Sequence, residues 1–107
     1  MDKLNILVVE DDPLDQQVIA DYLGSHAVDF AGDLDTAVRK LEGSRYDLCF
    51  LDLQLGKADD CSGLKLIPLA AAKGIYSVVM SGHDSEKMVA RAHELGCNDF
   101  YAKANQE

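Results

Sequence analysis

The amino-terminal part of the chain reads Leu4-Asn5-Ile6-Leu7-Val8-Val9-Glu10-Asp11-Asp12-Pro13, an apolar run that turns acidic in a single step. An apolar run of this length is typical of a strand buried on both faces of a parallel sheet. Pro13 suits the first turn of a helix, and Asp12 is the expected helix N-cap. The stretch therefore predicts a strand and then a helix, with Glu10 and Asp11 at the turn between them.

The same alternation continues to the end of the chain. Further strands are expected at residues 26–31, 46–51, 75–80 and 98–102, and helices at residues 13–23, 33–42, 63–73 and 85–95. Pro68 lies inside the third of these helices and is expected to kink it. Strands that alternate with helices predict the α/β class, here one domain over residues 1–107 with a doubly wound, five-stranded parallel sheet.

Composition excludes several classes of function. A net charge of −9 leaves no basic surface for direct binding to nucleic acid. No apolar run is long enough to span a membrane, and the start of the chain lacks the features of a signal peptide, so we expect a cytoplasmic protein. The three cysteines, Cys49, Cys61 and Cys97, have no C-x-x-C spacing, which argues against a disulfide framework or a zinc site.

Unusual polar residues follow four of the five expected strands. In an open α/β sheet, functional crevices form at the carboxyl ends of the strands, so these side chains should meet at one edge. The edge would then carry three carboxylates, one hydroxyl and one ammonium group, from Glu10, Asp11, Asp52, Ser81 and Lys103.

Carboxylates gathered in this way favour a bound cation. At about 5 Å and an effective dielectric constant near 20, each pair repels by roughly 3 kcal/mol. Oxygen ligands select a hard cation, and Mg²⁺ suits an open site. Beside such an ion Asp52 can act as an oxygen nucleophile toward a phosphoryl group, while Ser81 and Lys103 donate to the phosphoryl oxygens.

The motifs along the chain resemble those of response-regulator receiver domains of two-component signalling, of the chemotaxis-regulator kind. The resemblance covers nearly the whole chain and implies a flavodoxin-like sheet with strand order 2-1-3-4-5. It is carried by Ile6-Leu7-Val8-Val9-Glu10-Asp11-Asp12, Asp47-Leu48-Cys49-Phe50-Leu51-Asp52-Leu53-Gln54-Leu55, Ser62-Gly63-Leu64, Val78-Val79-Met80-Ser81-Gly82 and Gly96-Cys97-Asn98-Asp99-Phe100-Tyr101-Ala102-Lys103.

The resemblance implies a particular metal site. Asp52 would be both the phosphorylated residue and a metal ligand. Asp11 would bind the metal directly, Glu10 largely through water, and Gln54 through its backbone carbonyl. The ion would be Mg²⁺, with Mn²⁺ able to replace it.

The resemblance also implies a switch and a set of partners. Ser81 fills the position of the switch hydroxyl, Phe100 that of the switch aromatic residue, and Lys103 that of the lysine that contacts the phosphate. The donor would be a sensor histidine kinase or a phosphotransfer protein. Phosphorylation would change the surface that a downstream protein binds, and the domain would not be an enzyme beyond slow loss of its own phosphate.

Three features depart from the family pattern. The first acid is Glu10 where Asp is commoner, and Ala104 follows Lys103 where proline is usual, which disfavours a cis peptide there. Only four residues follow Lys103, so we expect the fifth helix of the family to be missing, either from the protein itself or because a longer protein was clipped. We therefore expect exposed apolar strand residues on one face of the sheet, and a homodimer or another protein to cover them.

Two other functions stay open on the sequence. The chain could be a receiver-like module for protein interaction or dimerisation that does not depend on phosphorylation. It could also be a Mg²⁺-dependent aspartyl phosphohydrolase, although such enzymes usually carry an Asp-x-Asp pair and a cap segment. Asp52 is followed two residues later by Gln54, and no cap segment exists.

Overall fold

The structure is a computed structural model, and it describes residues 3–53, 62–82 and 86–102. Within these ranges five strands alternate with helices in chain order. The strands are β1 (Asn5–Val9), β2 (Ala27–Ala31), β3 (Leu48–Asp52), β4 (Tyr76–Ser81) and β5 (Asp99–Ala102). The helices are α1 (Pro13–Leu23), α2 (Leu34–Gly43), the short 3₁₀ helix η1 (Ser62–Lys65), α3 (Leu66–Ala72) and α4 (Glu86–Leu95).

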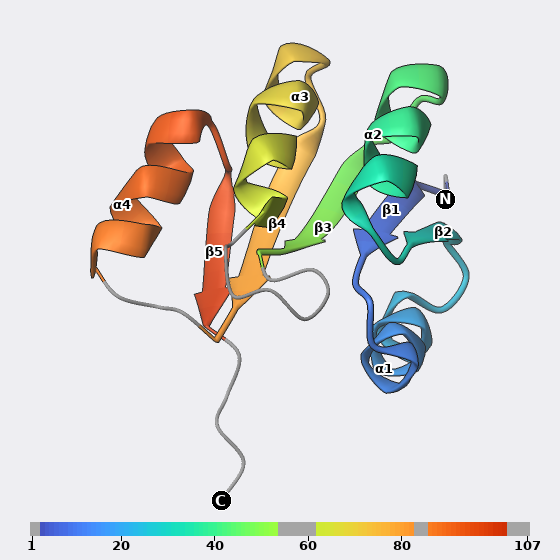
Figure 1. The fold of residues 1–107 in the computed structure, drawn as a ribbon. Helices are drawn as coiled ribbons and strands as arrows, with labels where there is room; N and C mark the ends of the chain where they lie inside the picture. The colour runs from blue at the N-terminus through green and yellow to red at the C-terminus, as the bar shows by residue number, and fades with distance from the viewer. Residues whose placement is uncertain (1–2, 54–61, 83–85, 103–107) are drawn as a thin grey trace, which may run out of the picture.

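All five strands are parallel and lie in the order β2-β1-β3-β4-β5, which confirms the predicted class and topology. The helices α2, α3 and α4 lie in a row along one face of the sheet, and α1 lies on the other (Figure 1). The main core fills the space between the sheet and the row of three helices. It contains Leu7, Val9, Leu41, Cys49, Leu51, Leu66, Ile67 and Val79, all fully buried.

Local sequence explains where the first two helices begin. The Asp12 carboxylate accepts a hydrogen bond from the Leu14 amide at 2.9 Å, and Pro13 takes the first helical position, as predicted. Asp33 caps α2 in the same way, through the Thr36 amide at 2.7 Å.

The third helix differs from the prediction. A single helix kinked at Pro68 was expected, but the segment is divided into η1 and α3, and α3 begins only at Leu66. Pro68 is therefore the third residue of α3. Proline is tolerated in the first turn of a helix, where the missing amide costs little.

The face that carries α1 is partly open, as expected. Of the strand residues on this face, Ile6, Val8 and Val78 are buried, while Tyr76 and Tyr101 are 48% and 60% exposed. The helix α1 also carries exposed apolar side chains. Its side chains Leu14, Val18 and Tyr22 are 77%, 54% and 88% exposed and form one stripe, because they are spaced four residues apart.

Candidate metal and phosphoryl-acceptor site

The strand β1 delivers two acids to the edge of the sheet. The Glu10 amide donates to the carbonyl of Ala31 at 3.0 Å, which extends the pairing with β2 by one residue. Glu10 is 1% exposed, whereas Asp11 is exposed to solvent. The turn into α1 thus places one buried and one accessible carboxylate side by side.

The turn itself is held by hydrogen bonds around Glu10. The Glu10 carboxylate accepts the Asp12 amide at 3.2 Å. The side-chain amide of Gln16, one turn into α1, donates to the Glu10 backbone carbonyl at 2.6 Å. Buried polar groups need such partners, so the first turns of α1 fix the acid pair in place.

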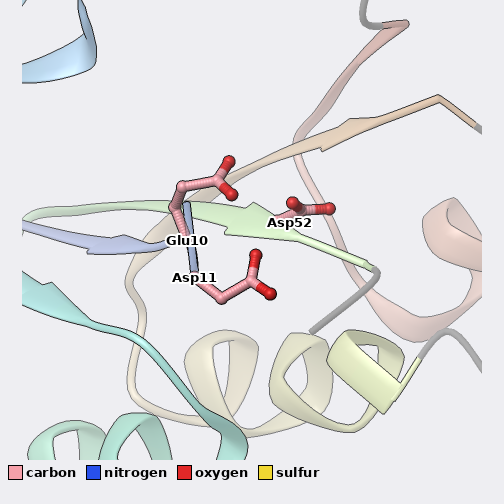
Figure 2. A group of neighbouring side chains, drawn as sticks. All are labelled: Glu10, Asp11 and Asp52. Carbon is pink, nitrogen blue, oxygen red and sulfur yellow. The ribbon is translucent and has the colours of Figure 1, made fainter. Parts of the chain in front are cut away.

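The third carboxylate comes from the neighbouring strand. Asp52 is the last residue of β3 and is 5% exposed. Because Val9 of β1 is paired with Leu51 of β3, the next residues along both strands, Glu10 and Asp52, reach the edge together. The side chains of Glu10, Asp11 and Asp52 converge on one space (Figure 2), and each offers an oxygen within 4.8 Å of the others.

This cluster has the composition of a site for a hard divalent cation. All three side chains supply carboxylate oxygens, which Mg²⁺, Mn²⁺ and Ca²⁺ prefer. Oxygens on opposite sides of one such ion lie about 4–5 Å apart, so the observed spacing fits a single shared ion. The exposure of Asp11 leaves the site open to an incoming phosphoryl group.

Ser81 and Phe100 lie on the next strands along the sheet. Ser81 ends β4 and is fully buried. Asp52 is paired with Met80, so Ser81 lies one residue further along its strand than the partner of Asp52. Phe100 is paired with Val79 and packs against the core on the same face. Gln54 and Lys103 lie outside the described residues, as does Ala104, so their parts in the site stay predictions.

Sequence reasoning assigned no role to two residues at this site. Gln16 follows Glu10 by six positions and belongs to the next helix, and nothing in the sequence links its amide to that carbonyl. Gly63 was noticed only as part of a motif, yet its amide donates to the carbonyl of Leu53, the residue after Asp52, at 2.9 Å.

Another polar recess lies at the amino ends of the strands, far from the acids. It is lined in part by Asn5, Arg45, Asp47 and Lys73. The Lys73 ammonium group there donates to the carbonyls of Leu41 and Glu42 at the end of α2, so it serves to cap that helix. None of the described helices is long and apolar enough to cross a membrane.

The carboxylate cluster and the strand order have a counterpart among known families. The family model for the response regulator receiver domain matches residues 6–107. The chain belongs to this family. The match begins in β1, and it includes all three clustered acids and both Ser81 and Phe100.

Two curated proteins are similar to this one over most of the chain. The regulatory protein VirG of Agrobacterium tumefaciens is 35% identical over 105 residues, which cover 92% of this chain and 38% of VirG. A protein-glutamate methylesterase/protein-glutamine glutaminase of Geobacter sulfurreducens is 28% identical over 107 residues, which cover 96% of this chain and 28% of that protein. The chain thus spans well under half the length of these relatives.

Solved receiver structures share the fold and hold groups that fit the acidic site. A response regulator from Burkholderia pseudomallei, solved with a phosphorylated aspartic acid, a calcium ion and citrate, is 28% identical with a TM-score of 0.84, covering 98% of this chain and 62% of that one. The Mn²⁺-bound form of the response regulator Rcp1 is 26% identical with a TM-score of 0.81, covering 96% and 83%.

Proposed function

We propose that this chain is a cytoplasmic phospho-acceptor switch, phosphorylated on Asp52 in a Mg²⁺-dependent reaction. The observation that carries the proposal is the convergence of Glu10, Asp11 and Asp52 within 4.8 Å at the open edge of the sheet. Receiver structures at 26–28% identity hold a phosphorylated aspartate or a divalent metal ion, which supports this assignment.

The donor is a phosphohistidine on a sensor histidine kinase or a phosphotransfer protein. A carboxylate oxygen of Asp52 forms a bond to phosphorus while the phosphorus–nitrogen bond breaks. The electron pair stays on the imidazole, which takes up a proton. A divalent cation, when bound, offsets the negative charge that gathers between the phosphoryl group and the carboxylates.

The chain's own residues prepare this step. Burial keeps the Asp52 carboxylate at the end of β3 with little freedom, and Glu10 and Asp11 would hold a divalent cation beside it. We assign a third protein ligand to the Gln54 carbonyl and a phosphate contact to Lys103. Ser81 donates its hydroxyl to a phosphoryl oxygen.

Signalling follows from the new charge. Phosphorylation replaces one negative charge with about two and adds acceptor oxygens, which draw the Ser81 hydroxyl toward them. Phe100 on the neighbouring strand then moves into the space behind Ser81. The surface of α4, β4 and β5 changes, and a coupling of about 1–3 kcal/mol is enough to shift the affinity for a downstream protein.

Intact-mass spectrometry tests the proposal directly. With Mg²⁺ and acetyl phosphate, we expect the protein to gain the mass of one phosphoryl group, and to gain none when the metal is chelated. Asp52→Asn should abolish the gain, whereas Asp35→Asn, an exposed acid in the first turn of α2, should retain it. A gain that persists in Asp52→Asn would overturn the assignment, and turnover of phosphate esters would favour a hydrolase.

A second function is favoured by the exposed stripe on α1. We propose that Leu14, Val18 and Tyr22 form a homodimer interface, since a stripe two turns long can pair with its own copy about a two-fold axis. The helix carries Asp15 and Asp21 but no basic residue, so the two copies repel and added salt should strengthen the dimer.

Light scattering decides this second proposal. We expect the dimer mass to be lost in Val18→Glu and kept in Tyr76→Lys, which changes an exposed tyrosine outside α1, at the start of β4. If the dimer forms equally with Asp52→Asn, it is independent of phosphorylation. A monomer at all concentrations and salt levels would contradict the interface.

A further inference from the structure

Gly63 lies against the main chain directly after the proposed phospho-acceptor. A Cβ atom at position 63 would lie under 3.0 Å from the backbone carbonyl oxygen of Asp52 and 2.8 Å from the Cα atom of Leu53. It would also lie 3.1 Å from the Leu53 carbonyl oxygen. These are backbone atoms, so no change of side-chain rotamer can relieve the contact.

The backbone at Asp52 and Leu53 has little room to move away. Asp52 belongs to β3, which is paired with β1 on one side and β4 on the other. The Leu53 side chain is fully buried in the main core. The hydrogen bond from the Gly63 amide to the Leu53 carbonyl, 2.9 Å long, draws η1 onto this segment. A larger residue at position 63 must therefore displace η1, the peptide after Asp52, or both.

Among the described glycines, only Gly63 would bring an added Cβ atom within 3.0 Å of backbone atoms. A Cβ atom added at Gly32 or Gly43 would have no atom within 4 Å. Gly63 is not one of the described glycines with a positive φ. Glycine is therefore required at this position because a side chain would clash, and not because of the backbone conformation. The missing side chain allows a close approach of two backbones at the residue on which the site depends.

We propose that Gly63 is a positioning residue for the phospho-acceptor. Its lack of a side chain sets the place of the Asp52–Leu53 peptide, and through it the distance of the Asp52 carboxylate from Glu10 and Asp11. This inference rests on the proposed function, and it goes beyond that function because it assigns an effect on metal affinity to a residue that has no side chain. Displacements of about 1 Å at such a site are enough to cost large factors in rate.

The test compares Gly63→Ala with Gly32→Ala, using Mn²⁺ as the probe and electron paramagnetic resonance to count the free ion. We expect Gly63→Ala to bind Mn²⁺ about tenfold more weakly or worse, and to take up phosphate more slowly even at saturating metal. Gly32→Ala should match the wild type in both. A role in stability alone would lower the denaturation midpoint and leave the Mn²⁺ affinity of the folded protein unchanged.

Each other outcome is also decisive. Folded Gly63→Ala with wild-type Mn²⁺ affinity, or an equal loss in Gly32→Ala, overturns the inference and leaves the proposed function intact. If Gly63→Ala is unfolded in buffer, the titration is repeated in sucrose, which favours the compact state. If Gly63→Ala is unfolded in sucrose as well, glycine at this position is needed for the whole protein to fold, and this outcome also overturns the inference. Wild-type protein that binds no Mn²⁺ overturns the proposed function first, and the inference with it.

Discussion

The side-chain amide of Gln16 donates a hydrogen bond to the backbone carbonyl of Glu10 across 2.6 Å. This contact ties the second turn of α1 to the end of β1, where the acid pair lies. It accounts for how an exposed carboxylate, Asp11, can be held near Asp52 although Asp11 itself belongs to no strand or helix.

Gln16→Met should weaken the acid site. Methionine keeps the length of the side chain but leaves the Glu10 carbonyl without its donor, at a cost of about 1 kcal/mol in unfolding free energy. We expect Mn²⁺ affinity to fall several-fold as the turn loosens. Gln17→Met is the matched control, because the Gln17 amide bonds Asp21 on the exposed surface. Equal metal affinity in the two variants would contradict the role of Gln16.

Asp11→Asn should change stability in opposite directions with and without metal. In the absence of divalent ions the substitution removes repulsion from Glu10 and Asp52, and the unfolding free energy should rise by about 1 kcal/mol or more. With Mg²⁺ at about 100 times its dissociation constant, the wild type gains about 2.7 kcal/mol and should become the more stable protein. Urea denaturation in EDTA and in Mg²⁺ measures the difference in unfolding free energy between Asp11→Asn and the wild type under each condition. A destabilised Asp11→Asn in EDTA would contradict the repulsion.

Ionised Asp29 should stabilise the folded protein, and we expect this part of the unfolding free energy to be lost in strong acid. Burial alone would raise its pKa, but hydrogen bonds from Lys40 at 2.7 Å and Tyr46 at 2.8 Å outweigh it, so the pKa is lowered from 3.8. A carboxyl group whose pKa is lower in the folded than in the unfolded state stabilises the fold at pH values above its unfolded-state pKa. This stabilisation is lost as the pH falls through the folded-state pKa. Asp29→Asn should therefore cost stability at pH 7 and much less in strong acid, as measured by denaturation at both pH values. Asp35→Asn is the control, and an equal cost of Asp29→Asn at both pH values would exclude this linkage.

Ser77→Ala should stabilise the protein. The Ser77 hydroxyl is fully buried in β4 and has no hydrogen-bond partner among the described residues. An unpaired buried hydroxyl costs about 1–3 kcal/mol, so its removal should raise the unfolding free energy by about 1 kcal/mol. Thermal and urea denaturation measure the change. A clear loss of stability would show that the hydroxyl has a partner.

Much of the molecule follows from local pattern. Apolar runs ended by Glu10, Asp52 and Ser81 placed three strands and their end residues, because a buried parallel strand must be apolar along its length. Since parallel strands end at one edge, the meeting of Asp11 with Asp52 could also be predicted. Helix caps at Asp12 and Asp33 followed from short-range hydrogen-bonding preferences.

Other features depend on contacts between segments distant in the sequence. Leu14, Val18 and Tyr22 share one face of α1 because they are spaced four residues apart, but only the packing of the fold shows that this face is left exposed. Pro68 was predicted to kink a helix, yet a change to 3₁₀ geometry before it places it in a first turn.

The α/β class, the order of the elements and the acids at the strand ends could be read from the amino-acid sequence, because each depends on residues adjacent in the chain. The hydrogen bond from Gln16 to the Glu10 carbonyl and the need for glycine at position 63 beside Asp52 became visible only in the folded protein. Hydrogen bonds and steric exclusion act over a few ångströms in space, whatever the separation of the residues along the chain.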